Sequence, residues 1–180
     1  MKIPISKRLR LCAQLVPEGA RVADIGTDHG YLGLYLLQNG RAAHVLAADL
    51  RPQPLQTAKL HAAKFGFAGQ MEFRLSDGLA EIGPDEADTI VCAGMGGDLI
   101  VEILSACPWL RDRNYTLILQ PQSAGQELRR WLDRKSIGFL FDASDPEIMF
   151  SDKLSQRVAR DFKKLAPFYE LCMKAEASPE

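Results

Sequence analysis

The segment Val22-Ala23-Asp24-Ile25-Gly26-Thr27-Asp28-His29-Gly30-Tyr31-Leu32 joins an apolar run, a polar loop bounded by two glycines, and a second apolar run. This pattern predicts a strand, a turn and a helix. Glycine allows positive φ and close approach of a ligand, and the helix that follows directs unpaired N–H groups toward the loop. Nucleotide-like cofactors are held in this way in doubly wound sheets. Taken alone, the segment fits an ordinary strand-to-helix turn equally well.

Strands and helices alternate on both sides of this segment. Strands are predicted at residues 21–25, 44–48, 71–74, 89–92 and 115–119, and helices at residues 5–15, 31–38, 55–65, 98–104 and 126–135. Such alternation is typical of a parallel α/β sheet with right-handed crossovers. Farther along, residues 138–141 and 168–173 fit two late strands, and the polar, basic segment between them at 151–164 fits a helix.

The composition is that of one globular domain with a full apolar core. The chain has 180 residues, of which 47% are hydrophobic and 25% charged, and its net charge is −1. We therefore expect a single domain at residues 1–180. Without an overall basic excess, any polyanion must be held by local charge. No apolar run reaches membrane-spanning length, and Lys2 is not followed by the apolar core of a signal peptide.

The cysteines point to a reducing compartment. Cys12, Cys92, Cys107 and Cys172 are widely spaced and form no CxxC pair. This spacing supports neither a zinc site nor a redox pair, and four separate thiols suit the cytosol. We therefore predict a cytoplasmic protein with no bound metal and no membrane partner.

Glycine or acidic residues recur where the predicted strands end. They are found at four of the five strand ends, at residues 26–30, at Asp49, at Asp77-Gly78 and at residues 93–97, and the fifth strand ends at Gln120-Pro121. In a doubly wound sheet, ligands bind beyond the carboxyl ends of the strands. The recurrence is more specific than any single loop, and it favours a cofactor site over an ordinary turn.

The residue types at these ends favour S-adenosylmethionine over a dinucleotide. The first loop does not match GxGxxG, and the carboxylate of Asp28 would repel a pyrophosphate. Asp49 ends the second strand, where an acid typically accepts hydrogen bonds from a ribose diol, although a cap for the helix after Pro52 is the alternative. Asp77 is placed to meet the adenine amine, or else to form a turn with Gly78. A cationic cofactor with ribose and no phosphate fits these residues.

Five segments carry a family resemblance. They are Arg8-Leu9, Asp24-Ile25-Gly26-Thr27-Asp28-His29-Gly30-Tyr31-Leu32, Ser76-Asp77-Gly78-Leu79, Ala93-Gly94-Met95-Gly96-Gly97-Asp98-Leu99-Ile100 and Leu119-Gln120-Pro121. Over residues 6–132 the chain resembles the bacterial tRNA adenine-N1 methyltransferases called TrmK, which are class I methyltransferases. The resemblance implies an α/β Rossmann-like doubly wound sheet of seven strands, the last antiparallel, with helices on both faces. It also implies S-adenosylmethionine-dependent methylation of adenine N1 at position 22, in the D-arm of tRNA.

The predicted site combines cofactor, catalytic and substrate residues. The cofactor-binding residues are predicted to be Asp24, Gly26, Thr27, His29, Gly30, Asp49, Leu50, Asp77, Gly78, Ala93, Gly94 and Met95. The substrate-binding residues are predicted to be Arg8, Tyr31, Gly96, Gly97, Gln120 and Pro121. Asp28 is the predicted catalytic residue, because a carboxylate stabilises the positive charge that develops on the methylated base or takes a proton from its amine. A capping role for Asp28 and packing roles for Tyr31 and Met95 are the alternatives.

The remaining predictions concern the N-terminal and C-terminal segments of the chain and its partners. Residues 1–17 are expected to form a helix covering the cofactor site, and residues 136–180 to form divergent strands with an inserted basic segment. The TrmK family usually continues into a coiled-coil appendage, which we expect to be missing because the sequence ends at Glu180. We expect tRNA as partner and a monomer or weak dimer. A small-molecule methyltransferase and a cofactor-binding module without activity are the competing interpretations.

Overall fold

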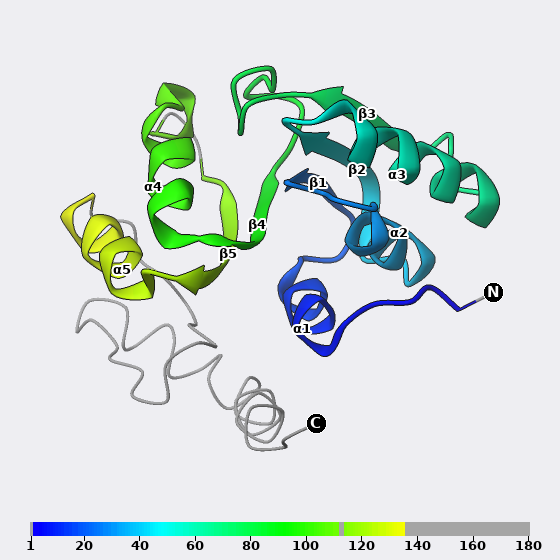
Figure 1. Cartoon of the computed structure of the whole chain (residues 1–180), viewed down its shortest axis with the longest axis horizontal. Coiled ribbons are helices and arrows are strands. Elements are labelled where there is room, and N and C mark those ends of the chain that lie inside the picture. Colours follow the sequence, from blue (N-terminus) through cyan, green and yellow to red (C-terminus); the bar gives the residue numbers. More distant parts are fainter. Residues whose placement is uncertain (1, 112–113, 136–180) are drawn as a thin grey trace.

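A parallel sheet of five strands forms the centre of the described structure, in the order β3-β2-β1-β4-β5 (Figure 1). The computed structural model describes residues 2–111 and 114–135. The strands are β1 (Ala20–Ile25), β2 (Ala42–Asp49), β3 (Met71–Leu75), β4 (Thr89–Gly96) and β5 (Thr116–Ser123). Every pairing is parallel. The strand order reverses between β1 and β4, so their carboxyl ends flank a topological switch point.

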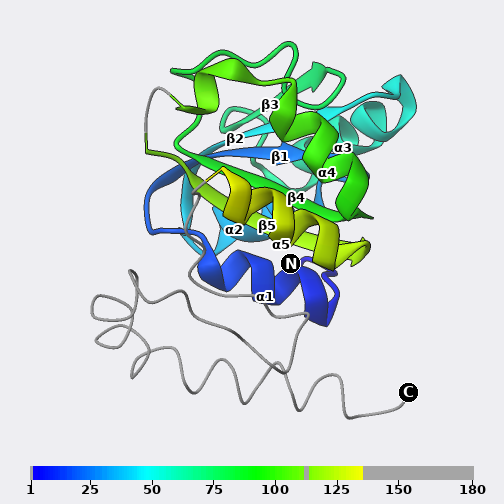
Figure 2. The same cartoon turned by 90° about the vertical axis from the view of Figure 1, so that its left-hand side faces the viewer.

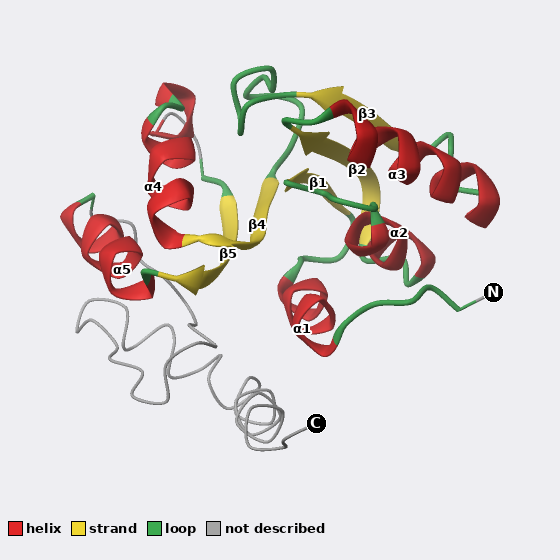
Figure 3. Cartoon of the chain, viewed as in Figure 1, coloured by secondary structure: helices red, strands yellow, loops and turns green. Residues whose placement is uncertain are grey.

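Helices cover both faces of this sheet (Figure 3). They are α1 (Lys7–Leu15), α2 (Tyr31–Gln38), α3 (Pro52–Phe65), α4 (Gly97–Ser105) and α5 (Gly125–Arg134), with a short 3-10 helix η1 (Pro108–Arg111). The first three lie on one face, and α4 and α5 lie on the other, in front of the sheet in Figure 2. The predicted doubly wound α/β fold is confirmed, and the two late strands predicted after residue 136 lie outside the described residues.

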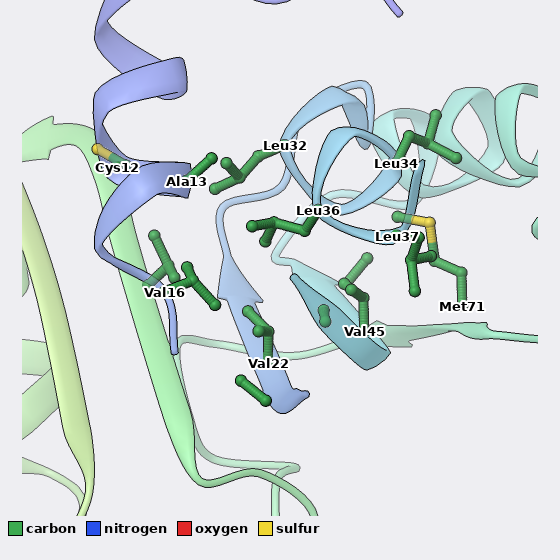
Figure 4. Packing of buried hydrophobic residues seen from close by; sticks show 14 of the residues in the cluster. Cys12, Ala13, Val16, Val22, Leu32, Leu34, Leu36, Leu37, Val45 and Met71 are labelled. Carbon is green, nitrogen blue, oxygen red and sulfur yellow. The ribbon is translucent and has the colours of Figure 1, made fainter. Parts of the chain in front are cut away.

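Two hydrophobic cores follow from alternation along the strands. Val22 and Val45 point into the core beneath α1 and α2, where Leu36 packs among them (Figure 4). Their chain neighbours Ala23 and Leu46 belong to the opposite core, beneath α4 and α5. Because successive strand residues face opposite sides, burial of both faces requires nearly continuous apolar strands. Among the described helices, none has both the length and the apolar character needed to cross a membrane.

Local signals explain where two helices begin. The Ser6 hydroxyl accepts a hydrogen bond from the Leu9 N–H at 3.3 Å, so α1 starts at Lys7, two residues later than predicted. Pro52 occupies the first turn of α3, where its fixed φ suits a helix and its missing N–H costs nothing. The helix therefore begins at residue 52, three residues before the start predicted at residue 55.

The glycine-rich segment after Cys92 and the Gln120-Pro121 segment are strand rather than loop, contrary to prediction. β4 runs on to Gly96 and β5 to Ser123, and Met95 pairs with Pro121. The register shifts on either side of Met95, and Gly94 has φ +86°. A bulge of this kind absorbs an extra residue, and it tolerates a proline that has no N–H to donate. The pairing thus continues past the point where the apolar pattern ends.

Candidate cofactor site

A cavity of about 510 Å³ opens at the carboxyl ends of the first four strands, a size typical of small-molecule sites. Its wall includes twelve of the residues predicted for the site: Arg8, Asp24, Gly26, Thr27, Asp28, Asp49, Leu50, Asp77, Gly78, Ala93, Gly94 and Met95. These residues come from α1, from the ends of β1 and β2, from the turn after β3 and from β4. The fold therefore brings together segments that the sequence only suggested were neighbours.

The loop after β1 is tied to β2 by its backbone. The N–H groups of Gly26 and Thr27 both donate to the carbonyl of Ala48, at 2.9 and 3.0 Å. The Thr27 hydroxyl donates to the buried carboxylate of Asp24 at 2.7 Å. Burial raises the pKa of Asp24 to about 6, the hydrogen bond from Thr27 opposes this rise, and the charge of Asp49 adds to it. Ionised Asp24 thus favours positive charge in the cavity.

Asp28 lies at the mouth of the cavity in an unusual backbone conformation. Its φ is +54°, a left-handed value that aspartate tolerates better than most residues, and its side chain is 66% exposed. The His29 ring nitrogen Nε2 lies 3.6 Å from its carboxylate. No side chain caps α2, whose N-cap is Gly30, so Asp28 does not have the capping role considered as an alternative. Its carboxylate is therefore accessible to a bound molecule.

Asp49 is held rigidly at the end of β2. Its two carboxylate oxygens accept hydrogen bonds from the N–H groups of Arg51, at 3.0 Å, and of Asp28, at 3.4 Å. The side chain is buried, and no side chain caps α3, so a helix-capping role is not observed. Leu50, the next residue, is 65% exposed. A fixed acid beside an exposed apolar side chain suits a ribose joined to a flat ring.

The turn after β3 is held by the Ser76 hydroxyl and by the backbone carbonyl of Asp77, which accepts a hydrogen bond from the Ala80 N–H at 3.1 Å. The Ser76 hydroxyl donates to the Gly78 carbonyl at 2.9 Å and accepts from the Glu81 N–H at 3.1 Å. Asp77 lines the cavity. Its carboxylate is thus available to a ligand at the β3 end of the sheet.

The opposite end of the cavity is formed by α1 and β4, and Gln120 of β5 bonds to both of them. The Arg8 guanidinium Nη1 donates to the Gln120 side-chain oxygen at 2.8 Å, and the Gly94 N–H donates to the same oxygen at 3.1 Å. A Cβ on Gly94 would lie 2.9 Å from Arg8 Nη1. Gly94 therefore serves two purposes: it adopts positive φ, and it lets the guanidinium lie against the backbone.

Seven predicted site residues lie outside the cavity wall: His29, Gly30, Tyr31, Gly96, Gly97, Gln120 and Pro121. Two of the glycines have packing reasons, because a Cβ on Gly30 would lie 2.9 Å from Ala58 Cβ, and one on Gly97 would overlap the Ala124 carbonyl. The Tyr31 ring stacks on His61 with centroids 4.8 Å apart. Pro121 lines a smaller cavity of about 210 Å³ between β5 and α5.

The sequence reasoning missed seven residues of the wall: Leu9, Ile25, Leu32, Arg51, Ser76, Leu99 and Ile103. Most are apolar, and an apolar residue in a predicted helix or strand does not by itself indicate a ligand site. Leu99 and Ile103 share one face of α4 because they are four residues apart, and Leu99 is 45% exposed. An apolar pair at this spacing directly after a glycine-rich strand end was the signal that could have identified them.

The charges of the wall select for a particular kind of ligand. Four carboxylates, from Asp24, Asp28, Asp49 and Asp77, face the cavity with only two guanidinium groups. Such a wall attracts a cation or hydrogen-bond donors and repels a pyrophosphate. Within the described ranges no group of three or more His, Cys, Asp or Glu side chains is arranged to hold a metal ion.

Comparisons with known proteins agree with this geometry. Residues 5–144 match the family model described as a methyltransferase domain. The tRNA (adenine(22)-N(1))-methyltransferase of Bacillus subtilis is 40% identical over 131 residues, which are 73% of this chain and 55% of the relative. The crystal structure of B. subtilis TrmK, an M1A22 tRNA methyltransferase, aligns with a TM-score of 0.69 at 39% identity, over 74% of this chain and 57% of that one.

A structure from Streptococcus pneumoniae, in complex with S-adenosyl-L-methionine, aligns with a TM-score of 0.69 at 36% identity. The alignment covers 73% of this chain and 62% of that one. The chain thus spans little more than half the length of these relatives. With a family model matched over most of its length and a methyltransferase fold around the cavity, the chain belongs to the methyltransferase-domain family.

Proposed function

We propose that the cavity binds S-adenosylmethionine and that the protein methylates N1 of the adenine at position 22 in the D-arm of tRNA. The observation that carries the proposal is the acidic wall built from four strand ends, which suits a cationic, phosphate-free nucleoside. The similarity to the B. subtilis tRNA (adenine(22)-N(1))-methyltransferase supports the choice of substrate.

The described residues supply specific contacts for the cofactor. Asp49 accepts hydrogen bonds from the ribose hydroxyls, and Asp77 accepts one from the adenine amine. Leu50 and Leu99 offer exposed apolar surface to the adenine ring. Asp24 and the glycine loop face the cationic part of the cofactor. When bound, S-adenosylmethionine supplies a methyl group activated by its sulfonium charge.

Asp28 acts on the substrate base rather than on the cofactor. Adenine N1 has a free lone pair, so the protein does not need to deprotonate it before methyl transfer. A cation then develops on the base, and the exposed carboxylate of Asp28 stabilises this charge or takes a proton from the exocyclic amine. The wall also aligns the reactants and excludes water. Tyr31, Gly96, Gln120 and Pro121, which lie outside the cavity wall, and Arg8, which lines it, remain the proposed contacts to the RNA.

The setting of the reaction is also a proposal. Residues 1–180 act as one methyltransferase domain, monomeric or weakly dimeric, in the cytoplasm. Cys12, Cys92 and Cys107 are buried cysteines in no disulfide, which is compatible with a reducing compartment. Light scattering over a range of concentrations measures the oligomeric state.

Methyl transfer to unmodified tRNA, followed by nucleoside mass spectrometry, tests the proposed function. The full chain is incubated with S-adenosylmethionine and a transcribed tRNA, and with the same tRNA carrying guanine in place of the target adenine. We expect N1-methyladenosine only from the first. If S-adenosylhomocysteine binds but neither tRNA is methylated, the activity is not tRNA adenine methylation, and a small-molecule methyltransferase or a non-catalytic module takes its place.

A further inference from the structure

His61 lies on α3 and is hydrogen-bonded to the loop that carries Asp28. The ring nitrogen Nδ1 of His61 lies 2.9 Å from the backbone carbonyl oxygen of His29, the residue that follows Asp28. A carbonyl oxygen can only accept a hydrogen bond, so the contact requires a proton on Nδ1. The two histidines are 32 positions apart in the sequence, and the bond therefore ties α3 to the loop after β1.

The loop has an uncommon backbone conformation on both sides of His29. Asp28 has φ +54° and Gly30 has φ +75°, so both are left-handed. Glycine adopts this conformation freely, whereas an aspartate does so at a cost in free energy. A residue in such a conformation keeps it only where the surrounding contacts determine the backbone. The position of the Asp28 side chain therefore depends on what holds the loop.

Hydrogen bonds hold the backbone before and after the Asp28 side chain. The Asp28 N–H donates to the Asp49 carboxylate at 3.4 Å. The next carbonyl along the chain, that of His29, accepts from His61 at 2.9 Å. Asp49 belongs to the cavity wall and His61 does not. The bond from His61 is thus a restraint on the loop that can be removed without altering the wall.

Aromatic rings hold His61 beside the loop. The Tyr31 ring, at the start of α2, stacks on the His61 ring with centroids 4.8 Å apart and an interplanar angle of 21°. The His29 ring meets the other two edge-on, at 6.1 and 6.3 Å. The His29 Nε2 atom in turn lies 3.6 Å from the Asp28 carboxylate. The three rings therefore connect α2 and α3 to the Asp28 side chain.

We propose that His61 is a positioning residue for methyl transfer, because its Nδ1–H bond to the His29 carbonyl holds the Asp28 carboxylate at the mouth of the cavity. This inference rests on the proposed function, in which Asp28 acts on the substrate base. His61 does not line the cavity, so it acts through the loop and not on the cofactor. A displacement of about 1 Å at a catalytic group lowers a rate by up to about 100-fold.

Two substitutions separate the hydrogen bond from the ring stacking. His61→Phe keeps a flat ring beside Tyr31 and removes the N–H, whereas His61→Asn removes the ring and keeps a donor close to the place of Nδ1. With saturating tRNA and cofactor, kcat should fall about ten-fold in His61→Phe and less than about three-fold in His61→Asn. The affinity for S-adenosylhomocysteine should change by less than about two-fold in both. His44→Phe, on β2 and outside the cavity wall, is the matched control and should retain full activity.

A double variant tests whether His61 acts through Asp28. Asp28→Asn removes the carboxylate, so adding His61→Phe to it should lower kcat by less than about a further two-fold. If the two losses multiply, His61 acts on something other than Asp28, and the positioning role is wrong. Full activity in His61→Phe, or equal losses in His61→Phe and His61→Asn, would also overturn it.

The protonation of His61 is measurable without any activity. Long-range nitrogen–proton correlation spectra of the unaltered protein identify which ring nitrogen carries a proton, and we expect Nδ1 to carry one. A neutral ring with its proton on Nε2 alone would contradict the proposal, because the bond to His29 could not form. If Nδ1 carries the proton and the unaltered protein methylates no tRNA, the proposed function and the role of His61 in catalysis fall, while the link between α3 and the loop stands.

Discussion

At the β2 end of the cavity Asp49 is held by neighbouring backbone, whereas at the β4 end Arg8 is held by a side chain from a distant part of the sequence. Asp49 accepts from the N–H of Arg51, two residues away. Arg8 and Gln120 are 112 residues apart, and their hydrogen bond requires α1, β4 and β5 to be assembled. Asp49 is thus positioned by the backbone of its own loop and of the loop after β1. Arg8 is positioned only when α1, β4 and β5 pack together.

The largest effect on activity is expected from a change of Asp28, which lies between the β2 and β4 ends of the cavity. Asp28→Asn should lower kcat by about 100-fold or more, because the carboxylate that stabilises the charged base is lost. The affinity for S-adenosylhomocysteine should change by less than about two-fold. Asparagine also tolerates the left-handed backbone found here, so the loop is preserved.

Initial-rate measurements with saturating tRNA check this prediction. Asp28→Gly is the companion variant, since it removes the carboxylate and relieves the positive φ at the same time. Full activity in either variant would remove Asp28 from the catalytic role.

The next effect tests the β2 end. Asp49→Asn should weaken S-adenosylhomocysteine by about 30- to 100-fold, because hydrogen bonds from the ribose to a charged acceptor are replaced by weaker ones. Isothermal titration measures this change, and Asp133→Asn, on the exposed part of α5, is the control. A loss of kcat with unchanged cofactor affinity would show that Asp49 does not bind the ribose.

Asp24 lies on β1, between the β2 and β4 ends of the cavity. Its contribution to the stability of the fold is expected to depend on pH. Because burial raises its pKa in the folded protein to about 6, from 3.8, the folded state holds the proton more tightly than the unfolded state. Protonation therefore favours folding, and this stabilisation is lost as pH rises from about 4 to about 6. The ionised, buried form is the less stable one.

Urea unfolding of Asp24→Asn and the unaltered protein measures this linkage. As pH rises from about 4.5 to about 7.5, the unaltered protein should lose about 2 kcal/mol of unfolding free energy relative to Asp24→Asn. A difference between the two proteins that is constant with pH would mean that Asp24 does not titrate in this range.

The smallest effect tests the β4 end. Gly94→Ala and Gly40→Ala both place a side chain at positive φ, and each should cost about 1 to 2 kcal/mol of stability. A Cβ at Gly40 meets nothing within 4 Å, whereas one at Gly94 meets Arg8. Only Gly94→Ala should therefore weaken S-adenosylhomocysteine, by about five- to ten-fold. Equal affinities in the two variants would mean that Gly94 does not lie against the cofactor.

Residues at both ends of the cavity were predicted from sequence, but the way in which the β4 end is assembled was not. Alternation of apolar runs predicted all five described strands, and Asp49 follows its strand directly. The extension of β4 through Gly96 depends on pairing with β5, and the link from Arg8 to Gln120 depends on tertiary contacts. Neither leaves a periodic pattern in the sequence. Leu99 and Ile103 were not predicted, because an apolar helix face has the same sequence pattern whether it covers a hydrophobic core or lines a cavity.

The cavity at the ends of β1, β2, β3 and β4 is proposed to hold the cofactor. An NMR titration with S-adenosylhomocysteine, following backbone amides, tests it most directly. The account predicts that the largest shifts fall at residues 24–28, 49–51, 76–78 and 93–95, which line that cavity. Shifts centred instead on residues 121–129, beside the smaller cavity between β5 and α5, or no shifts at all, would contradict it.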